Sequence, residues 1–161
     1  MNKVISIGNQ GFDKIRENDY FYVDKTGFIK EWWESGDDVT LITRPRRFGK
    51  TLNMDMLKCF FSNKYAERTD LFEGLSIWKE EKYRELQGQY PVIFLSFANV
   101  KEGNAEAAKM QMKALIARMY EENRFLLEGN LLSENEKKMY QNVTIYMSDV
   151  EAVIAISTMC M

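Results

Sequence analysis

The chain has 161 residues, 45% of them hydrophobic, which suits one globular domain or the first part of a larger one. Its charges almost cancel, with 22 Lys and Arg against 24 Asp and Glu, and a net charge of -2 argues against a general nucleic-acid coat. The absence of histidine excludes Ser-His and Cys-His nucleophile arrangements and removes the commonest transition-metal ligand.

The cysteines and the N-terminal residues bear on the cellular location of the protein. Cys59 and Cys160 lie far apart without a CxxC pairing, which suits a reducing environment. The first residues lack the charged start and long apolar core of a signal peptide, and no stretch approaches the roughly 20 apolar residues that span a bilayer. We therefore expect a soluble, cytoplasmic protein without a membrane partner.

The first predicted elements alternate between extended and helical. Residues 19–23 are aromatic and β-branched, which predicts a short strand or extended segment. A helix should then run through Phe28 and Trp33 and end near Gly36. Residues 39–43 form a short apolar run after a turn signal, as in a buried parallel strand.

A second helix should follow a loop at residues 44–49. Met54, Leu57 and Phe61 repeat at helical spacing, which predicts an amphipathic helix directly after the loop. The loop therefore lies between a predicted strand and a predicted helix.

The rest of the chain continues this alternation. Residues 63–89 are polar and predict a loop with short helices, residues 91–97 predict a second buried strand, and residues 104–127 predict a long helix. Ser133 with Glu136 resembles a capping box that opens a further helix.

Ser148 or Asp149 could cap a last helix that runs through Val150, Val153 and Ile154. Because strands and helices alternate, we predict an α/β layered fold with a mainly parallel sheet.

The segment from residue 43 to residue 51, TRPRRFGKT, contains the second half of a phosphate-binding loop. Such a loop turns backbone N–H groups toward the phosphates and places a lysine and a hydroxyl at a helix N-terminus. Gly49 permits close backbone approach, Lys50 is the phosphate cation, and Thr51 is the hydroxyl that binds Mg²⁺. The predicted cofactors are therefore ATP and Mg²⁺, and the predicted site residues are Arg46, Arg47, Phe48, Gly49, Lys50 and Thr51.

The loop departs from the usual pattern at its start. Arg44 occupies the position of the first glycine, and Pro45 lacks an N–H, so the entry cannot copy the usual turn. Arg46 and Arg47 could compensate as bidentate phosphate donors, or the arginines could bind a polyanion. The tripeptide GKT could also be accidental, although its place between a predicted strand and helix favours a phosphate site.

Hydrolysis would also need a carboxylate after a second hydrophobic strand. Residues 91–97 offer none before Glu102, and Asp149 is better explained as a helix cap. No catalytic residue is therefore predicted. Asp24, Lys25 and Thr26 could line the nucleotide site, but their position before a helix favours an N-cap with surface charge.

Three separated blocks resemble the AAA-ATPase-like family of bacteria and archaea. They are YVDKT at 22–26, LITRPRRFGKTLNMDML at 41–57 and PVIFLSF at 91–97, in the family's order and spacing. The resemblance implies an ATP-binding P-loop domain in which Lys50 and Thr51 match the phosphate lysine and the metal hydroxyl, and it makes Arg44 a family trait.

The resemblance also implies parts that this sequence does not contain. In the family an acidic motif of LIDEYD type follows, and many members continue into a nuclease-like domain of the PD-(D/E)xK kind. Residues 1–161 thus resemble the N-terminal part of such a domain, so the resemblance implies a P-loop NTPase-like layered fold that is incomplete in this chain. Nucleic acid stays open as a partner of the full-length parent.

Two functions from different classes follow from the sequence. The first is nucleotide binding through a variant Walker A loop, with hydrolysis weak or absent because no Walker B acid is evident. The alternative is a non-enzymatic module that holds nucleic acid or another polyanion with Arg44, Arg46 and Arg47, or an inactive relic. Neither the oligomeric state nor the physiological partner can be predicted.

Overall fold

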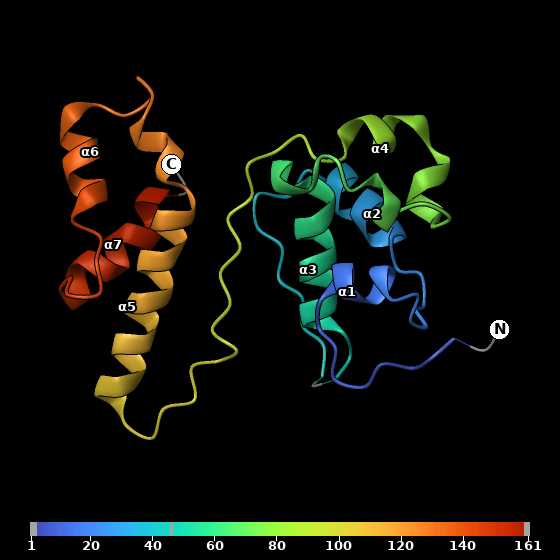
Figure 1. Cartoon of the computed structure of the whole chain (residues 1–161), viewed down its shortest axis with the longest axis horizontal. Helices are drawn as coiled ribbons and strands as arrows, with labels where there is room; N and C mark the ends of the chain where they lie inside the picture. The colour runs from blue at the N-terminus through green and yellow to red at the C-terminus, as the bar shows by residue number, and fades with distance from the viewer. Residues whose placement is uncertain (1–2, 46, 160–161) are drawn as a thin grey trace. The chain divides into compact units, whose positions relative to one another are not determined.

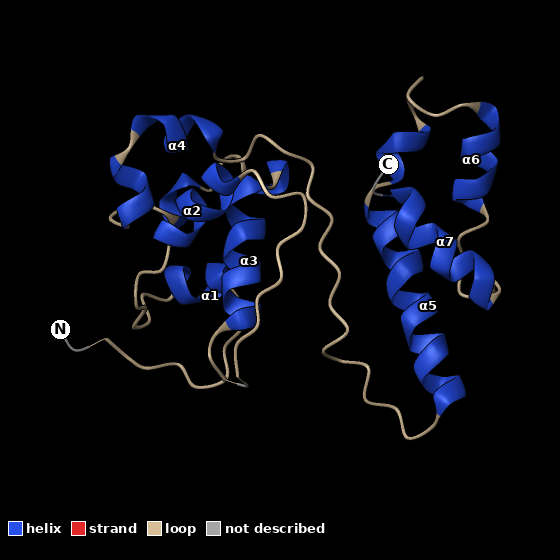
Figure 2. Ribbon diagram, turned by 180° about the vertical axis from the view of Figure 1, so that it is seen from behind, coloured by secondary structure: helices blue, strands red, loops and turns tan. Residues whose placement is uncertain are grey.

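The computed structural model describes residues 3–45 and 47–159. Every regular secondary-structure element in these ranges is a helix (Figures 1 and 2). Among the described residues, strand-like pairing is limited to one isolated parallel bridge between Ser62 and Tyr90. The prediction of an α/β fold with a mainly parallel sheet is therefore wrong.

The two predicted strands explain the error. Residues 39–43 and 91–97 have no regular secondary structure, and Val39 and Leu41 are 86% and 82% exposed instead of buried. An apolar run becomes a strand only where other strands take up its backbone hydrogen bonds, and an isolated pair of strands is marginal in water. The apolar pattern of these segments was therefore not sufficient to predict a sheet.

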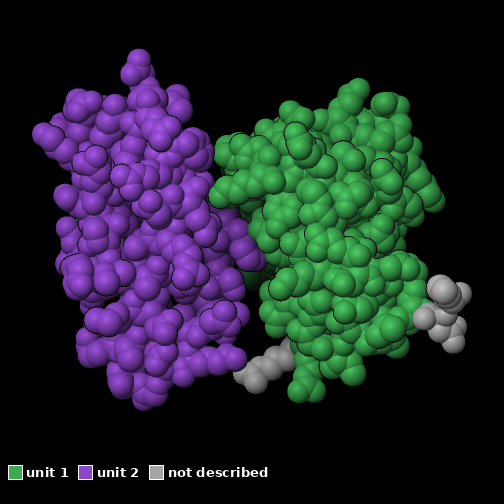
Figure 3. Space-filling model, viewed as in Figure 1, with its two compact units in different colours: residues 1–92 green, residues 93–161 purple. Residues whose placement is uncertain are grey.

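The described chain divides into two compact units, residues 1–92 and residues 93–161 (Figure 3). Unit 1 contains four α-helices and three short 3-10 helices in its described residues. They are α1 (Phe12–Glu17), α2 (Gly27–Ser35), α3 (Lys50–Phe61), η1 (Asn63–Tyr65), η2 (Thr69–Leu71), η3 (Ser76–Lys79) and α4 (Glu81–Leu86). As predicted, α2 ends near Gly36: its last residue is Ser35, and Gly36 is the C-cap in a left-handed conformation with φ 66°.

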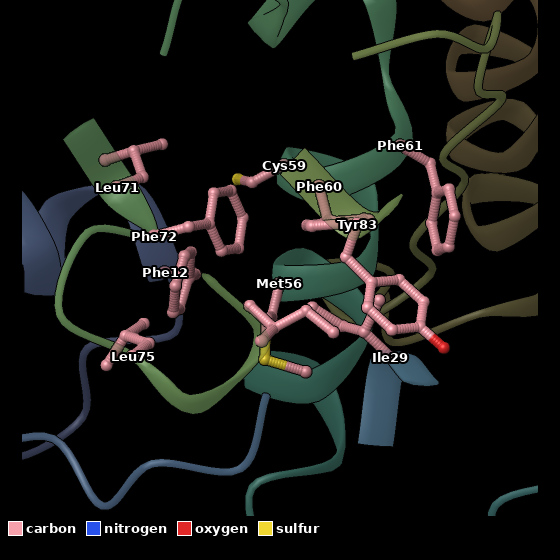
Figure 4. Close-up of a cluster of buried hydrophobic side chains, with 11 residues drawn as sticks. Phe12, Ile29, Met56, Cys59, Phe60, Phe61, Leu71, Phe72, Leu75 and Tyr83 are labelled. Atoms are coloured by element: carbon pink, nitrogen blue, oxygen red, sulfur yellow. The ribbon is translucent and has the colours of Figure 1, made fainter. Parts of the chain in front are cut away.

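The core of unit 1 is built around α3, with side chains from α1, α2 and the later helices directed toward it (Figure 4). Met56, Cys59 and Phe60 of α3 are fully buried, whereas Met54 of the predicted apolar face is 46% exposed. Each fully buried large apolar side chain stabilises the fold by about 1.5–3 kcal/mol. Burial also raises the pKa of the Cys59 thiol to about 12, so the thiol stays protonated.

Asp55 ties the start of α1 to the middle of α3. Its buried carboxylate accepts a hydrogen bond of 2.7 Å from the backbone N–H of Phe12 and pairs with Lys58 one turn later on α3. The N–H of Phe12 lies at a helix start, where it has no carbonyl partner within α1. Asp55 therefore satisfies a buried donor and fixes the position of α1 on α3.

Backbone hydrogen bonds from residues 87–90 complete the C-terminal end of α3. Gly88 N donates to the carbonyl of Phe60 at 2.8 Å, and Tyr90 N donates to that of Phe61 at 2.9 Å. These bonds satisfy carbonyls that have no partner inside the helix. The intervening segment is a loop with short helices, as the sequence predicted for residues 63–89.

Unit 2 is a smaller helical unit that contains α5 (Ala105–Glu122), η4 (Arg124–Leu127), α6 (Glu134–Gln141) and α7 (Asp149–Met159). Its buried cluster comprises Ile116, Met119, Tyr120, Met147 and Ala155. The predicted capping box of Ser133 and Glu136 is confirmed at the start of α6.

Asp149 begins α7 but is not its cap. Ser148 Oγ accepts a hydrogen bond of 3.2 Å from Glu151 N, while Asp149 forms ion pairs with Lys109 and Lys113 of α5. Hydrogen bonds from these lysines lower the pKa of Asp149 to about 2. Asp149 thus links α7 to α5.

The last helix, α7, is apolar on its solvent side as well as toward its unit. Val150 and Val153 are 68% and 74% exposed, although Ala155 is buried. Even so, within residues 3–45 and 47–159 no helix is both long and apolar enough to cross a membrane.

Candidate functional site

The candidate site lies at the N-terminal end of α3 in unit 1 (Figure 1). Gly49 is the N-cap residue with φ 74°, and its carbonyl accepts the first helical hydrogen bond, from Asn53 N at 2.9 Å. No side chain caps this end, and the first turn contains no acidic residue. The N–H groups of residues 50–52 are therefore available to an anion, which the helix dipole also favours.

Lys50 closes the loop in front of this helix end. Its ammonium donates to the backbone carbonyl of Arg44 and, at 3.2 Å, to that of Pro45. The positive charge of Lys50 is thereby held at the loop by two neutral carbonyls. An anionic oxygen would form a stronger, charge-assisted hydrogen bond with the same ammonium.

A cavity of about 360 Å³ opens beside Lys50. It is lined by Lys25, Phe28, Glu31, Ile42, Arg44, Phe48, Lys50 and Asn53. Three of these side chains are cations, while Glu31 is the single carboxylate in this lining. The cavity therefore has a positive lining next to a positive helix end, with two aromatic side chains at its wall.

Lys25 approaches the same helix end from the loop before α2. Its Nζ lies 3.9 Å from the point where a Cβ on Gly49 would be, so the ammonium faces the N-cap residue of α3. Sequence analysis favoured a surface role for residues 24–26. The structure instead separates them: Lys25 lines the cavity, whereas Asp24 and Thr26 serve the fold.

Asp24 and Thr26 hold the chain around Lys25 in place. The Asp24 carboxylate accepts hydrogen bonds from Thr26 N at 2.9 Å, Thr26 Oγ1 at 2.6 Å and Ser76 N at 2.7 Å. Thr26 is fully buried, and its Oγ1 also accepts from Ile77 N at 3.2 Å. The backbone of Lys25 is thus fixed on both sides.

Low pH should weaken the hydrogen bonds through which Asp24 holds the segment around Lys25. Partial burial acts to raise the pKa of Asp24, but hydrogen bonds from Thr26 and Ser76 outweigh it and hold the pKa below its usual 3.8. A carboxylate with a lowered folded-state pKa stabilises the fold above its unfolded pKa and loses this effect as the pH falls through the folded pKa. Asp24→Asn should therefore cost about 1–2 kcal/mol at pH 7, and the difference from the wild type should shrink below about pH 4.

The measurement is urea unfolding followed by tryptophan fluorescence at pH 7 and pH 3. All three tryptophans, Trp32, Trp33 and Trp78, belong to unit 1, so the signal reports on that unit. Asp38→Asn is the control, because Asp38 is exposed and accepts no hydrogen bond from a described residue. An Asp24→Asn deficit of equal size at both pH values would contradict the role of the Asp24 carboxylate.

The structure distributes the predicted site residues unevenly. Lys50 and Phe48 line the cavity, and Gly49 caps α3 beside it. Thr51 lies exposed in the first turn of α3, outside the cavity lining, and Arg47 is exposed with a left-handed φ of 69°. Arg46 lies outside the described residues.

Phe28, Glu31 and Asn53, which were not predicted as site residues, line the cavity, and so does Lys25, for which a surface role was predicted. Asn53 follows Lys50 by three positions on α3, and helical spacing could have indicated that they share a face. No local signal marked the two residues of α2. Among the described residues, no group of three or more Asp, Glu or Cys side chains could bind a metal ion.

An open helix N-terminus beside lysine and arginine side chains offers the donors and the charge that favour an anion such as phosphate. The model of the family described as "Predicted AAA-ATPase" matches residues 6–156. The chain therefore belongs to the AAA-ATPase-like family, and this membership indicates nucleotide binding in general.

A curated relative from Azotobacter chroococcum mcd 1, named "Uncharacterized protein in vnfD 5'region", is 43% identical over 96 residues. The match covers 59% of this chain but 17% of the relative, so the chain corresponds to a small part of that protein. No solved structure matches the chain.

Proposed function

We propose that the chain binds ATP with Mg²⁺ through a variant Walker A loop at residues 44–51. The observation that carries the proposal is the convergence of Lys25, Arg44 and Lys50 on the uncapped N-terminus of α3. Backbone N–H groups of residues 50–52 and three cations provide the donors and the charge that a phosphate chain requires. Family membership supports a nucleotide as the source of the phosphate.

Each loop residue has a role in this proposal. Lys50 exchanges the carbonyls of Arg44 and Pro45 for phosphate oxygens, and Gly49 allows the phosphate to approach the backbone. Thr51 contributes a hydroxyl to Mg²⁺, whose remaining ligands are phosphate oxygens and water, the usual arrangement for this ion. Arg47 and Arg46 add positive charge at the loop, and Phe48 contributes apolar surface to the cavity wall.

The residues of the site fit the binding of ATP with Mg²⁺ better than they fit ATP hydrolysis. Mg²⁺ would supply charge neutralisation to the phosphates when bound. In the described residues the cavity lining offers one carboxylate, Glu31, beside the three cations Lys25, Arg44 and Lys50. We therefore propose that hydrolysis by this chain is weak or absent.

Titration calorimetry with ATP, with and without Mg²⁺, tests the proposal. Lys50→Ala should weaken ATP binding by roughly 10- to 100-fold, because a hydrogen bond to a charged group contributes about 1.5–3 kcal/mol. Lys64→Ala is the matched control, since it removes an equal charge from an exposed position of unit 1 outside the cavity. Equal ATP affinity of Lys50→Ala and wild type would overturn the proposal.

The arginines offer a second function that the same experiment separates. Arg44 and Arg47 are exposed and form no ion pair with a described carboxylate, which also suits a polyanion. Binding of a single-stranded DNA oligonucleotide that weakens steeply with salt and needs no Mg²⁺, together with no ATP binding, would favour that function. A folded protein that binds neither ligand would favour an inactive relic.

A further inference from the structure

Lys25, like Lys50 on the other side of the cavity, has no acidic partner among the described residues, whereas three other lysines of unit 1 do. Lys30 pairs with Glu80, Lys82 with Glu34, and Lys58 with Asp55. Lys25 is exposed and forms no ion pair with any carboxylate of the described residues, although Glu31 lines the same cavity. Its charge is therefore available to a ligand.

The backbone at Lys25 is nevertheless fixed more firmly than a surface lysine requires. Asp24 and Thr26 bind each other and η3 through the hydrogen bonds described above, and Lys25 N donates to Tyr22 Oη at 3.4 Å. A side chain on a fixed backbone loses less conformational entropy when it binds. Unit 1 thus presents the Lys25 ammonium at a defined place.

That place is electrostatically unfavourable without an anion. The Lys25 ammonium faces Gly49 at the positive end of α3, and Lys50 and Arg44 line the same cavity. Cations are favoured at the C-terminal end of a helix and disfavoured at the N-terminal end. A multiply charged anion between these groups would remove the repulsion among them.

Lys25 and Lys50 approach this helix end from different segments. Lys50 is held on the loop side by the carbonyls of Arg44 and Pro45, whereas Lys25 comes from the chain before α2. Two ammonium groups on separate supports can engage two different phosphate groups of one ligand. A ligand with more phosphate groups would gain more from the second ammonium.

We propose that Lys25 is a second phosphate-binding cation, which makes this site prefer a nucleoside triphosphate to the corresponding diphosphate. The proposal rests on the nucleotide-binding function proposed above and specifies its ligand class. Lys50 provides phosphate affinity in general, and Lys25 adds selectivity for the more highly charged ligand.

The test compares ATP and ADP, each with Mg²⁺, by calorimetric titration of the wild type, Lys25→Ala, Lys25→Arg and Lys64→Ala. Lys25→Ala should weaken ATP binding roughly 10-fold and ADP binding less than about 3-fold, which corresponds to one lost charge-assisted contact. Lys25→Arg keeps the charge and should retain most of the preference. Lys64→Ala should leave both affinities unchanged.

The outcomes separate this proposal from the one on which it rests. An equal loss for ATP and ADP in Lys25→Ala, or no loss for either, overturns the selectivity role while Lys50→Ala still shows that nucleotide binds. A wild type that binds neither nucleotide, or unchanged binding by Lys50→Ala, overturns the nucleotide site itself. Thermal unfolding by tryptophan fluorescence should give Lys25→Ala a Tm no lower than that of the wild type, because the Lys25 side chain is exposed and its removal relieves the repulsion among these cations.

Discussion

Gly88→Ala should destabilise unit 1 by about 3 kcal/mol or more, through a left-handed φ and a steric clash together. Gly88 has φ 73°, which any L side chain adopts only with strain. A Cβ at this position would lie 2.4 Å from Ala66 Cα, a backbone atom that cannot move without displacing η1. The shift would also break the hydrogen bond from Gly88 N to the carbonyl of Phe60 at the end of α3.

Gly74→Ala separates the two causes. Gly74 has φ 77°, close to that of Gly88, but a Cβ there would meet nothing within 4 Å. It should therefore cost only the conformational part, about 1–2 kcal/mol. Urea unfolding followed by tryptophan fluorescence measures both variants. Equal losses for the two glycines would show that the close approach of Gly88 to Ala66 does not contribute.

Local signals in the sequence were sufficient to predict most helices. Gly36 marked the end of α2, the Ser133–Glu136 pair marked the start of α6, and apolar spacing indicated α3 directly after the loop. These signals act within one or two turns of a helix, so the sequence contains them in full. The rotation of α3 was predicted less well, because which face is buried depends on what packs against it.

The predicted sheet failed for the opposite reason. Residues 39–43 and 91–97 have the apolar pattern of buried strands, but a strand depends on partners that are distant in sequence. The described residues supply no ladder of such partners, and both segments have no regular secondary structure. The pattern of a short apolar run was therefore not enough to predict a strand.

In the candidate site, too, some residues could be predicted from their neighbours in sequence, and others depend on contacts with distant residues. The glycine and lysine before α3 could be predicted from neighbouring residues, and the structure places them at the helix start. Lys25 reaches Gly49 only because Asp24 and Thr26 attach its segment to η3, about fifty positions later in the chain. No local pattern encodes that attachment. The sequence therefore left two roles open for Lys25, in the nucleotide site or as a surface charge before a helix, and favoured the second.

Phe60→Ala should cost unit 1 about 3–5 kcal/mol, because it removes a fully buried ring from the last turns of α3 and leaves a cavity. The Phe60 ring packs edge-on against Phe72 and Phe61, with centroids 5.1 Å and 5.0 Å away. A loss of this size is a large fraction of the free energy of unfolding of a typical domain, which is about 5–15 kcal/mol. Urea unfolding monitored by tryptophan fluorescence measures it.

Phe21→Ala is the matched control, since Phe21 belongs to the same unit but is 54% exposed, and it should change stability by less than about 1 kcal/mol. Because α3 carries Phe60 near one end and Lys50 at the other, nucleotide affinity in Phe60→Ala should fall only in proportion to the unfolded fraction. Osmolyte that restores folding should then restore binding, which it cannot do for Lys50→Ala. A loss below about 1 kcal/mol in Phe60→Ala would show that the core of unit 1 is not organised around this helix.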